Sequence, residues 1–132
     1  MGQTIKFAAL GAVAFMVLDG LWLGLLMKNF NRDQLAPIVR LANGGIAPNW
    51  PAAVVVCALL GTGIALFVIP HASTVPLAAA RGALFGLVVY GVYDFTNYST
   101  LRQWPFVLTL ADVGWGAVAS AACAAVVRSA AR

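Results

Sequence analysis

Residues 51–69 read PAAVVVCALLGTGIALFVI, a segment without one charged side chain. A helix needs about 20 mostly apolar residues to cross a hydrocarbon core of roughly 30 Å. Trp50 stands before the segment and Pro51 opens it: an aromatic residue suited to the membrane interface, then a proline that the first turn of a helix tolerates. The segment therefore predicts a transmembrane helix.

The composition of the whole chain indicates the same class. Of its 132 residues, 62% are hydrophobic and 9% are charged, which excludes an ordinary soluble domain. The formal net charge of +4 comes from eight Lys and Arg against four acidic residues. Because the basic residues are scattered singly in loops and near the termini, they fit membrane flanks. A nucleic-acid partner is not expected.

Three further apolar segments, at about residues 4–27, 77–101 and 105–127, are long enough to cross a membrane. Together with 51–69 they predict an all-α protein, a four-helix transmembrane bundle that forms a single integral membrane domain over residues 1–132. The first loop, residues 28–50, interleaves apolar side chains with charged ones before Asn43-Gly44-Gly45 stops any helix. This pattern predicts a short interfacial helix in that loop.

Three of the four acidic residues, Asp19, Asp94 and Asp112, lie inside the predicted spans. A charged carboxylate at membrane depth costs about 2.5–3.5 kcal/mol on insertion scales, so these positions indicate a site. With a helical rise of about 1.5 Å per residue, all three lie about 10–14 Å below the face that carries the 28–50 loop. We therefore expect one layer of carboxylates, turned toward a shared polar interior.

Aromatic and polar side chains accompany this layer at helical spacing. Trp22 and Trp115 each follow an Asp by three residues, while the third span brings its own polar group around Asp94. The candidate ligand-binding residues are Asp19, Trp22, Tyr90, Asp94, Asn97, Tyr98, Arg102, Asp112 and Trp115. The cations Lys28, Arg32 or Arg102 could also fold inward from the interface and pair with an Asp.

Small residues on the three Asp-bearing spans predict that the helices approach closely. The glycines concerned are Gly20 and Gly24 in the first span, Gly82 and Gly86 in the third, and Gly116 in the fourth. Such small residues let helix backbones come together in a membrane.

Several roles remain open for the Asp layer. Each Asp could bond a Tyr, Trp, Asn or Thr on a neighbouring helix and only fix the packing. A carrier would bind a proton or a hard cation such as Mg²⁺ or Na⁺, held, if at all, by Asp19, Asp94 and Asp112. An enzyme would use the carboxylates in acid/base or metal-assisted chemistry on a lipid headgroup. A binding or accessory subunit would hold a membrane lipid or a partner helix, and the sequence itself requires no cofactor.

The distribution of basic residues leaves the membrane orientation undecided. The positive-inside rule compares Lys and Arg in short loops and near the ends of the spans. The count is four against four, with Lys28, Arg32, Arg40 and Arg102 on the face of the first loop and Lys6, Arg81, Arg128 and Arg132 on the other.

Three strings occur in a fixed order: LDGLWLG at 18–24, YDFTNYSTLRQWP at 93–105 and DVGWG at 112–116. Together they resemble a family of small bacterial four-helix membrane proteins that is known only as a domain of unknown function, family 2177. The second string is the most specific. The resemblance implies a multi-pass protein of the bacterial inner (cytoplasmic) membrane, with a motif on the same three Asp, and it implies no activity.

A ligand- or lipid-binding or accessory role is the leading hypothesis from these observations. An integral-membrane enzyme acting on a lipid headgroup is second, and a proton- or cation-coupled carrier is third. Membrane lipid is the expected partner, and a homo-oligomer or a larger membrane complex remains open.

Overall fold

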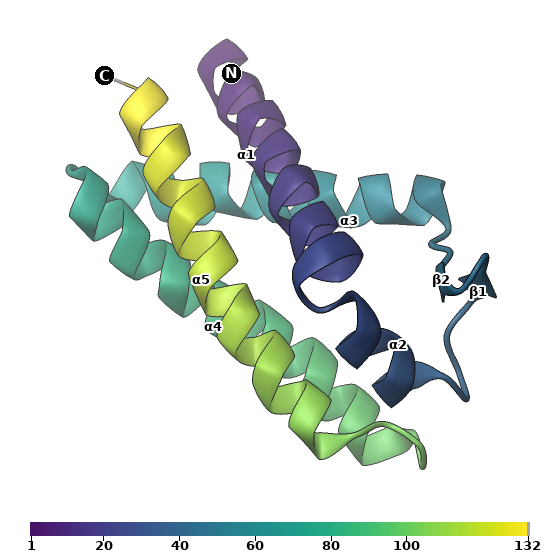
Figure 1. The fold of residues 1–132 in the computed structure, drawn as a ribbon. Helices are drawn as coiled ribbons and strands as arrows, with labels where there is room; N and C mark the ends of the chain where they lie inside the picture. Colours follow the sequence, from purple (N-terminus) through teal and green to yellow (C-terminus); the bar gives the residue numbers. More distant parts are fainter. Residues whose placement is uncertain (132) are drawn as a thin grey trace.

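The computed structural model describes residues 1–131 and is built almost entirely from helices (Figure 1). Four helices in this part of the chain are long and apolar enough to cross a membrane. They confirm the all-α class and the four predicted spans, whose ends shift by only a few residues. Their bounds are Gly2–Leu26, Trp50–His71, Val75–Thr100 and Phe106–Ala130.

Two of the spans change their helical geometry toward their carboxyl ends. The first consists of α1 (Gly2–Leu21) and the π-helical turn η1 (Trp22–Leu26). The second consists of α3 (Trp50–Gly63), the π-helical η2 (Ile64–Val68) and the 3₁₀-helical η3 (Ile69–His71). The third and fourth are the helices α4 (Val75–Thr100) and α5 (Phe106–Ala130).

Side-chain caps and prolines fix the starts of α3 and α4. The Asn49 side chain accepts a hydrogen bond from the backbone N–H of Ala52 at 3.3 Å, and Pro51 lies in the first turn. At α4, the Thr74 hydroxyl accepts from the N–H of Leu77, also at 3.3 Å. These groups satisfy backbone donors that a helix start leaves unpaired.

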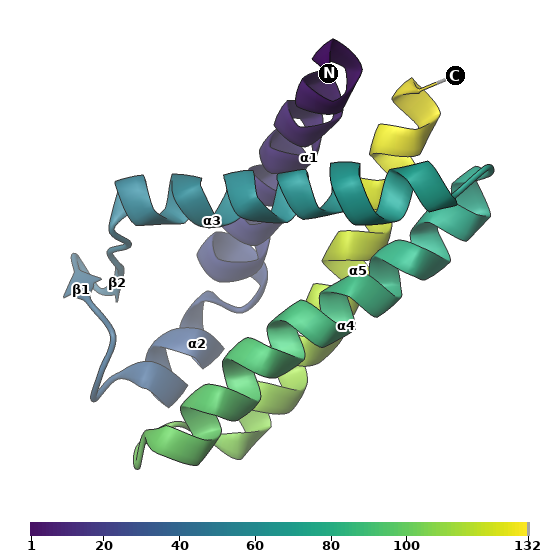
Figure 2. The same cartoon turned by 180° about the vertical axis from the view of Figure 1, so that it is seen from behind.

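The four spans pack as two pairs, and the second span crosses the others. Helix α4 packs along the length of α5, and α1 packs against α3. Figures 1 and 2 show α3 running across the other helices, with the end of this span close to the start of α4 and its beginning, beside β2 (Gly45–Ile46), far from α4. A wedge therefore opens between α3 and the α4–α5 pair at the end where α3 begins.

Glycines decide how closely the pairs approach. A Cβ on Gly86 would overlap the backbone carbonyl of Gly116, and one on Gly82 would overlap that of Ser120. The predicted close approach is confirmed for α4 and α5. It is wrong for the first span at Gly20 and Gly24, where a Cβ would meet nothing within 4 Å.

The close backbone contact of the first span lies nearer its amino end, at a glycine of α3. There Gly61 lies against the backbone of Ala8 and Ala12, so close that a Cβ would overlap both. The prediction failed at Gly20 and Gly24 because α1 packs mainly on α3. The glycine that allows this close approach therefore belongs to the second span.

The first loop confirms the predicted short helix and adds a small hairpin. The helix α2 spans Lys28–Leu35, and the strands β1 (Leu41–Ala42) and β2 (Gly45–Ile46) pair antiparallel. Asn43 and Gly44 both have positive φ, 52° and 75°. Positive φ at both central residues is typical of the tight turns that join hairpin strands. We call residues 28–49 the cover segment.

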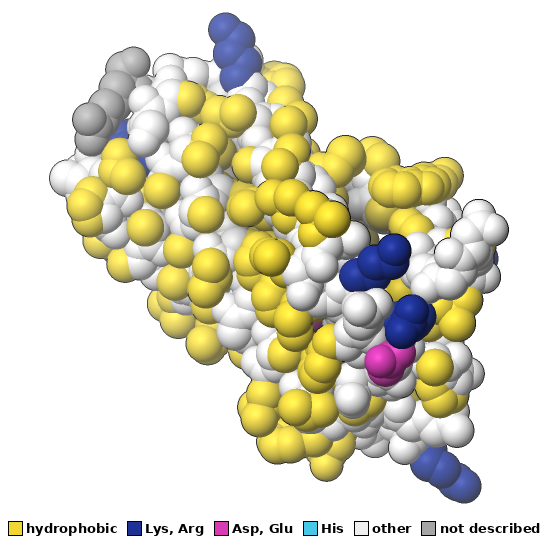
Figure 3. Space-filling view, in the orientation of Figure 1, with side chains coloured by type: hydrophobic (Ala, Val, Ile, Leu, Met, Phe, Trp, Pro, Cys, Tyr) yellow, Lys and Arg dark blue, Asp and Glu magenta, His cyan; other side chains and the backbone are white. Residues whose placement is uncertain are grey.

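The outer surface is largely apolar. Figure 3 shows hydrophobic side chains over most of one face, with Lys and Arg near the ends and the cover segment. Leu59, Phe67 and Leu84 are each more than 60% exposed. In a bilayer these side chains contact lipid, which the composition predicts.

Candidate functional site

A cavity of about 430 Å³ fills the wedge between the spans, beneath the cover segment. We call it the loop-side cavity. Most of its lining is apolar. Its polar and aromatic lining side chains include Asp19, Trp22, Asn31, Tyr90, Asp112 and Trp115.

Asp19 joins three spans at the wall of this cavity. Its Oδ1 accepts a hydrogen bond from the indole Nε1 of Trp115 in α5 at 2.9 Å and a longer one from the Tyr90 hydroxyl in α4 at 3.4 Å. Bonds to a carboxylate contribute about 1.5–3 kcal/mol each when well formed. Asp19 is therefore held in place by its neighbours, as the packing alternative expects, while it also lines the cavity.

Asp112 of α5 lines the same cavity and is half-buried. Its carboxylate lies within electrostatic range of Asp19 and of Asp94. The indole N–H of Trp22 lies near Asp112 but outside hydrogen-bonding geometry, and it has no other partner. Two carboxylates from two different helices thus face one cavity.

Aromatic rings form much of its wall. Trp22 and Trp115 stack with their ring centroids 4.5 Å apart and their planes 8° from parallel. Tyr93 and Trp104 meet edge to face at 5.9 Å and also line the cavity. Neither Tyr93 nor Trp104 was among the site residues predicted from the sequence, because no helical spacing from an Asp singled them out.

The cover segment closes the cavity with one amide and several apolar side chains. Asn31 is only 1% exposed, and its Nδ2 has no hydrogen-bond partner. Leu35, Val39 and Ile46 line the cavity beside it. None of these residues was among the site residues predicted from the sequence. Asn31 and Leu35 are four residues apart on one side of α2, a spacing that the sequence shows, whereas Val39 and Ile46 follow after the end of that helix.

Four of the predicted site residues lie outside this lining. Asp94 is fully buried, and neither of its carboxylate oxygens has a hydrogen-bond partner. Asn97 is half-buried, Tyr98 is 47% exposed and packs on Phe106, and Arg102 is exposed. The structure therefore gathers Asp19, Trp22, Tyr90, Asp112 and Trp115 around one cavity and leaves the end of α4 outside it.

No cation folds inward to an intramembrane Asp in the part of the chain that the structure describes. The one ion pair there joins Arg32 to Asp33 at 3.0 Å on the surface. Such exposed pairs contribute about 0–1 kcal/mol. Within residues 1–131, no group of three His, Cys, Asp or Glu side chains is placed to hold a metal ion.

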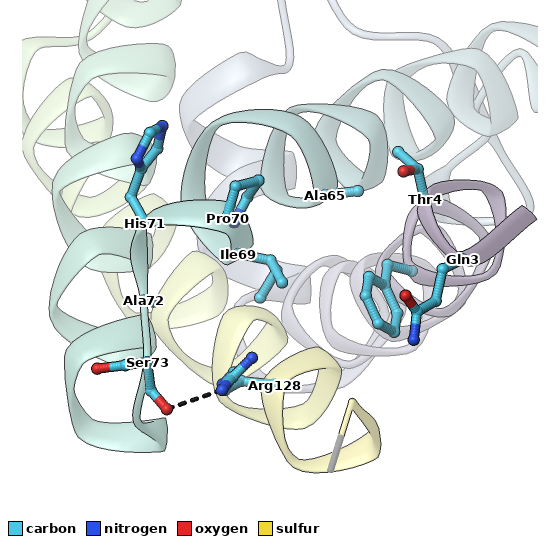
Figure 4. Close-up of a pocket in the computed structure, with 10 residues that line it drawn as sticks. Gln3, Thr4, Ala65, Ile69, Pro70, His71, Ala72, Ser73 and Arg128 are labelled. Atoms are coloured by element: carbon cyan, nitrogen blue, oxygen red, sulfur yellow. Dashed lines mark hydrogen bonds between the residues drawn. The ribbon is translucent and has the colours of Figure 1, made fainter. Parts of the chain in front are cut away.

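A second cavity, of about 500 Å³, lies at the opposite end of the molecule (Figure 4). The start of α1, the η3 turn and Arg128 line it. Arg128 Nη2 donates a hydrogen bond to the backbone carbonyl of Ser73 at 2.8 Å, drawn as a dashed line in Figure 4. None of the predicted site residues lies there.

Comparison with known proteins gives one match. The family model described as "Predicted membrane protein (DUF2177)" matches residues 4–128, nearly the whole chain, and confirms the family resemblance. No curated protein and no solved structure matches the chain.

Proposed function

Because the chain belongs to the DUF2177 family of predicted membrane proteins, we propose a membrane function for its loop-side cavity: it binds an amphipathic, lipid-derived ligand. In this role the protein serves as a ligand-binding or accessory subunit of a bacterial inner membrane. The observation that carries the proposal is Asn31, a buried amide donor without a partner at the wall of an apolar cavity. A buried polar group left unpaired costs about 1–3 kcal/mol, which a bound acceptor would recover.

The shape and lining of the cavity favour an amphipathic ligand. Its polar groups gather at Asp19, Asp112 and Asn31, while the remaining walls are apolar or aromatic. Ligand sites commonly combine apolar walls with a few placed polar groups. A molecule with a polar end and a hydrocarbon chain matches both parts.

Exposed apolar side chains at the edge of the loop-side cavity support the proposal that its ligand comes from the bilayer. Val56 of α3 and Val89 of α4 both line the cavity, and they are 52% and 36% exposed. Because both side chains line the cavity and are also exposed, we propose that the cavity opens laterally toward the lipid between α3 and α4. A lipid tail could remain in the bilayer while its polar end occupies the cavity.

The test is a comparison of co-purified lipids. Val56→Trp fills the cavity, whereas Val55→Trp adds the same ring one residue away, on a side chain that is 56% exposed and does not line the cavity. We expect mass spectrometry of the purified proteins to find a lipid-derived species bound to the wild type and to Val55→Trp. That species should be depleted at least severalfold in Val56→Trp.

Equal lipid content in all three proteins would contradict the proposal. Conversion of the bound lipid during incubation would instead support the second hypothesis, an enzyme acting on a lipid headgroup. Correct folding of each variant is checked by its elution as a single species and by its melting temperature in detergent.

A further inference from the structure

We infer that the polar end of the ligand in the loop-side cavity is an ammonium group with an oxygen acceptor close to it. The inference rests on the function proposed above and specifies the chemical class of its ligand. Three features of the cavity carry it: the charges that line it, its aromatic walls and the unpaired donor in its cover.

The charges that line the cavity are all negative. Asp19 and Asp112 line it from α1 and α5, and no Lys, Arg or His is among its lining residues. The one ion pair within residues 1–131 lies on the surface, at Arg32 and Asp33. Carboxylates removed from water need a compensating partner, and in this cavity a ligand can supply it.

The aromatic walls favour an organic cation. Trp22 and Trp115 stack beside the two carboxylates, and Tyr90, Tyr93 and Trp104 complete the aromatic part of the lining. The electron-rich face of a Trp or Tyr ring attracts a cation within about 6 Å of its centroid. Rings combined with carboxylates form the kind of site that recognises an ammonium group.

An inorganic cation fits this lining less well. Mg²⁺ and Ca²⁺ require six or more oxygen ligands, counting water, whereas two carboxylates and apolar rings line most of this wall. An ammonium group needs fewer oxygen ligands than these metal ions. It can be held by one or two carboxylates together with the faces of aromatic rings. The residues that line the cavity therefore match an amine better than a metal.

Asn31 adds a second requirement for the ligand, a hydrogen-bond acceptor. Its Nδ2 is a donor without a partner at a side chain only 1% exposed, so it calls for an acceptor on the ligand. An oxygen next to the amine satisfies it. A phosphoethanolamine headgroup and a single-chain amino alcohol both present this chemistry, one from a bilayer phospholipid and the other from a free amphiphile.

The experiment compares an amine with its alcohol. The delipidated full-length protein in detergent is titrated with dodecylamine and with dodecanol, and binding is followed by tryptophan fluorescence, since three of the four tryptophans line the cavity. We expect the amine to bind at least about tenfold more tightly, as a charge-assisted contact would give. Asp112→Asn should remove the difference, and Asp33→Asn, a surface change, should preserve it.

The outcomes separate this inference from the proposed function. If amine and alcohol bind equally, the ammonium assignment is overturned while the amphiphile site stands. If neither binds, the proposed function fails with it. The comparison of the two probes on the wild type is sufficient even where Asp112→Asn does not fold.

Competition in nanodiscs identifies the source of the ligand. If phosphatidylethanolamine displaces dodecylamine and phosphatidylglycerol with the same chains does not, the ligand is a phospholipid headgroup. If neither phospholipid competes while the amine remains bound, the ligand is a free amphipathic amine. Both results support the shared ammonium chemistry, and stronger competition by phosphatidylglycerol would contradict it.

Discussion

Asp94 shows most clearly how the position of a single residue can differ from the expected one. It lies in the richest polar stretch of the sequence, yet the structure buries it completely and outside the loop-side cavity. Neither carboxylate oxygen has a hydrogen-bond partner. Asp19, by contrast, has two donors and a place on the cavity wall. Two residues with the same chemistry at a similar depth thus have different surroundings.

We predict that Asp94→Asn raises the free energy of unfolding by about 1–3 kcal/mol, because Asn keeps the shape of the side chain but cannot ionise, so its burial carries no cost of removing a carboxylate from water or of protonating it. Melting temperatures of the purified proteins in detergent measure it. Asp33→Asn, at an exposed position, is the control and should stay within about 0.5 kcal/mol of the wild type. A destabilised Asp94→Asn protein would show that the carboxylate makes an essential contact.

At the scale of elements, the hairpin of α4 and α5 is held by backbone contact. A Cβ on Gly86 would overlap the backbone carbonyl of Gly116, and a Cβ on Gly116 would overlap the side chain of Tyr90. This close approach places Tyr90 and Trp115 on adjacent helices, where both donate to Asp19. The glycines therefore position the aromatic wall of the loop-side cavity.

The same substitution at two glycines of α4 should have opposite effects. Gly86→Ala inserts a methyl group against the Gly116 backbone, and such overpacking costs about 1–3 kcal/mol. Gly91→Ala meets nothing within 4 Å and should stabilise the helix by about 0.5–1 kcal/mol. Thermal unfolding of both variants in detergent checks the signs, and a neutral Gly86→Ala would mean that the two helices separate easily.

At the scale of the whole molecule, the even number of spans puts both termini at one end, as Figure 1 shows. The cover segment and the loop-side cavity lie at the other end. The Lys and Arg count is equal on the two faces, so the sequence gives the inserting chain little preference for either orientation.

One added charge should therefore be enough to bias the orientation. We predict that His71→Arg favours a cytoplasmic location of the termini, while Gln103→Arg favours a cytoplasmic cover segment. Both side chains are exposed, and they lie at opposite ends of the molecule. Topology reporters fused to the carboxyl end, expressed in a bacterial inner membrane, measure the ratio of the two orientations. Identical ratios in the two variants would contradict the prediction.

The sequence by itself determined the membrane class, the four spans and the presence of acids within them, because hydropathy and helical rise are local properties. Residues 51–69 need only their own side chains to specify a transmembrane helix. The depths of Asp19 and Asp112 followed in the same way from their distance along the chain to the ends of their spans.

Only the tertiary structure decided which of these residues meet. Depth along a helix does not specify the direction in which a side chain points, so Asp94 was expected beside Asp19 and Asp112 in one pocket and instead lies outside the cavity lining. The cavity itself exists because α3 crosses the other spans and the cover segment folds over the wedge that this crossing leaves. The spacing of Asn31 and Leu35 places both on one side of α2, but only the folding of the cover segment over the spans decides that this side faces the cavity.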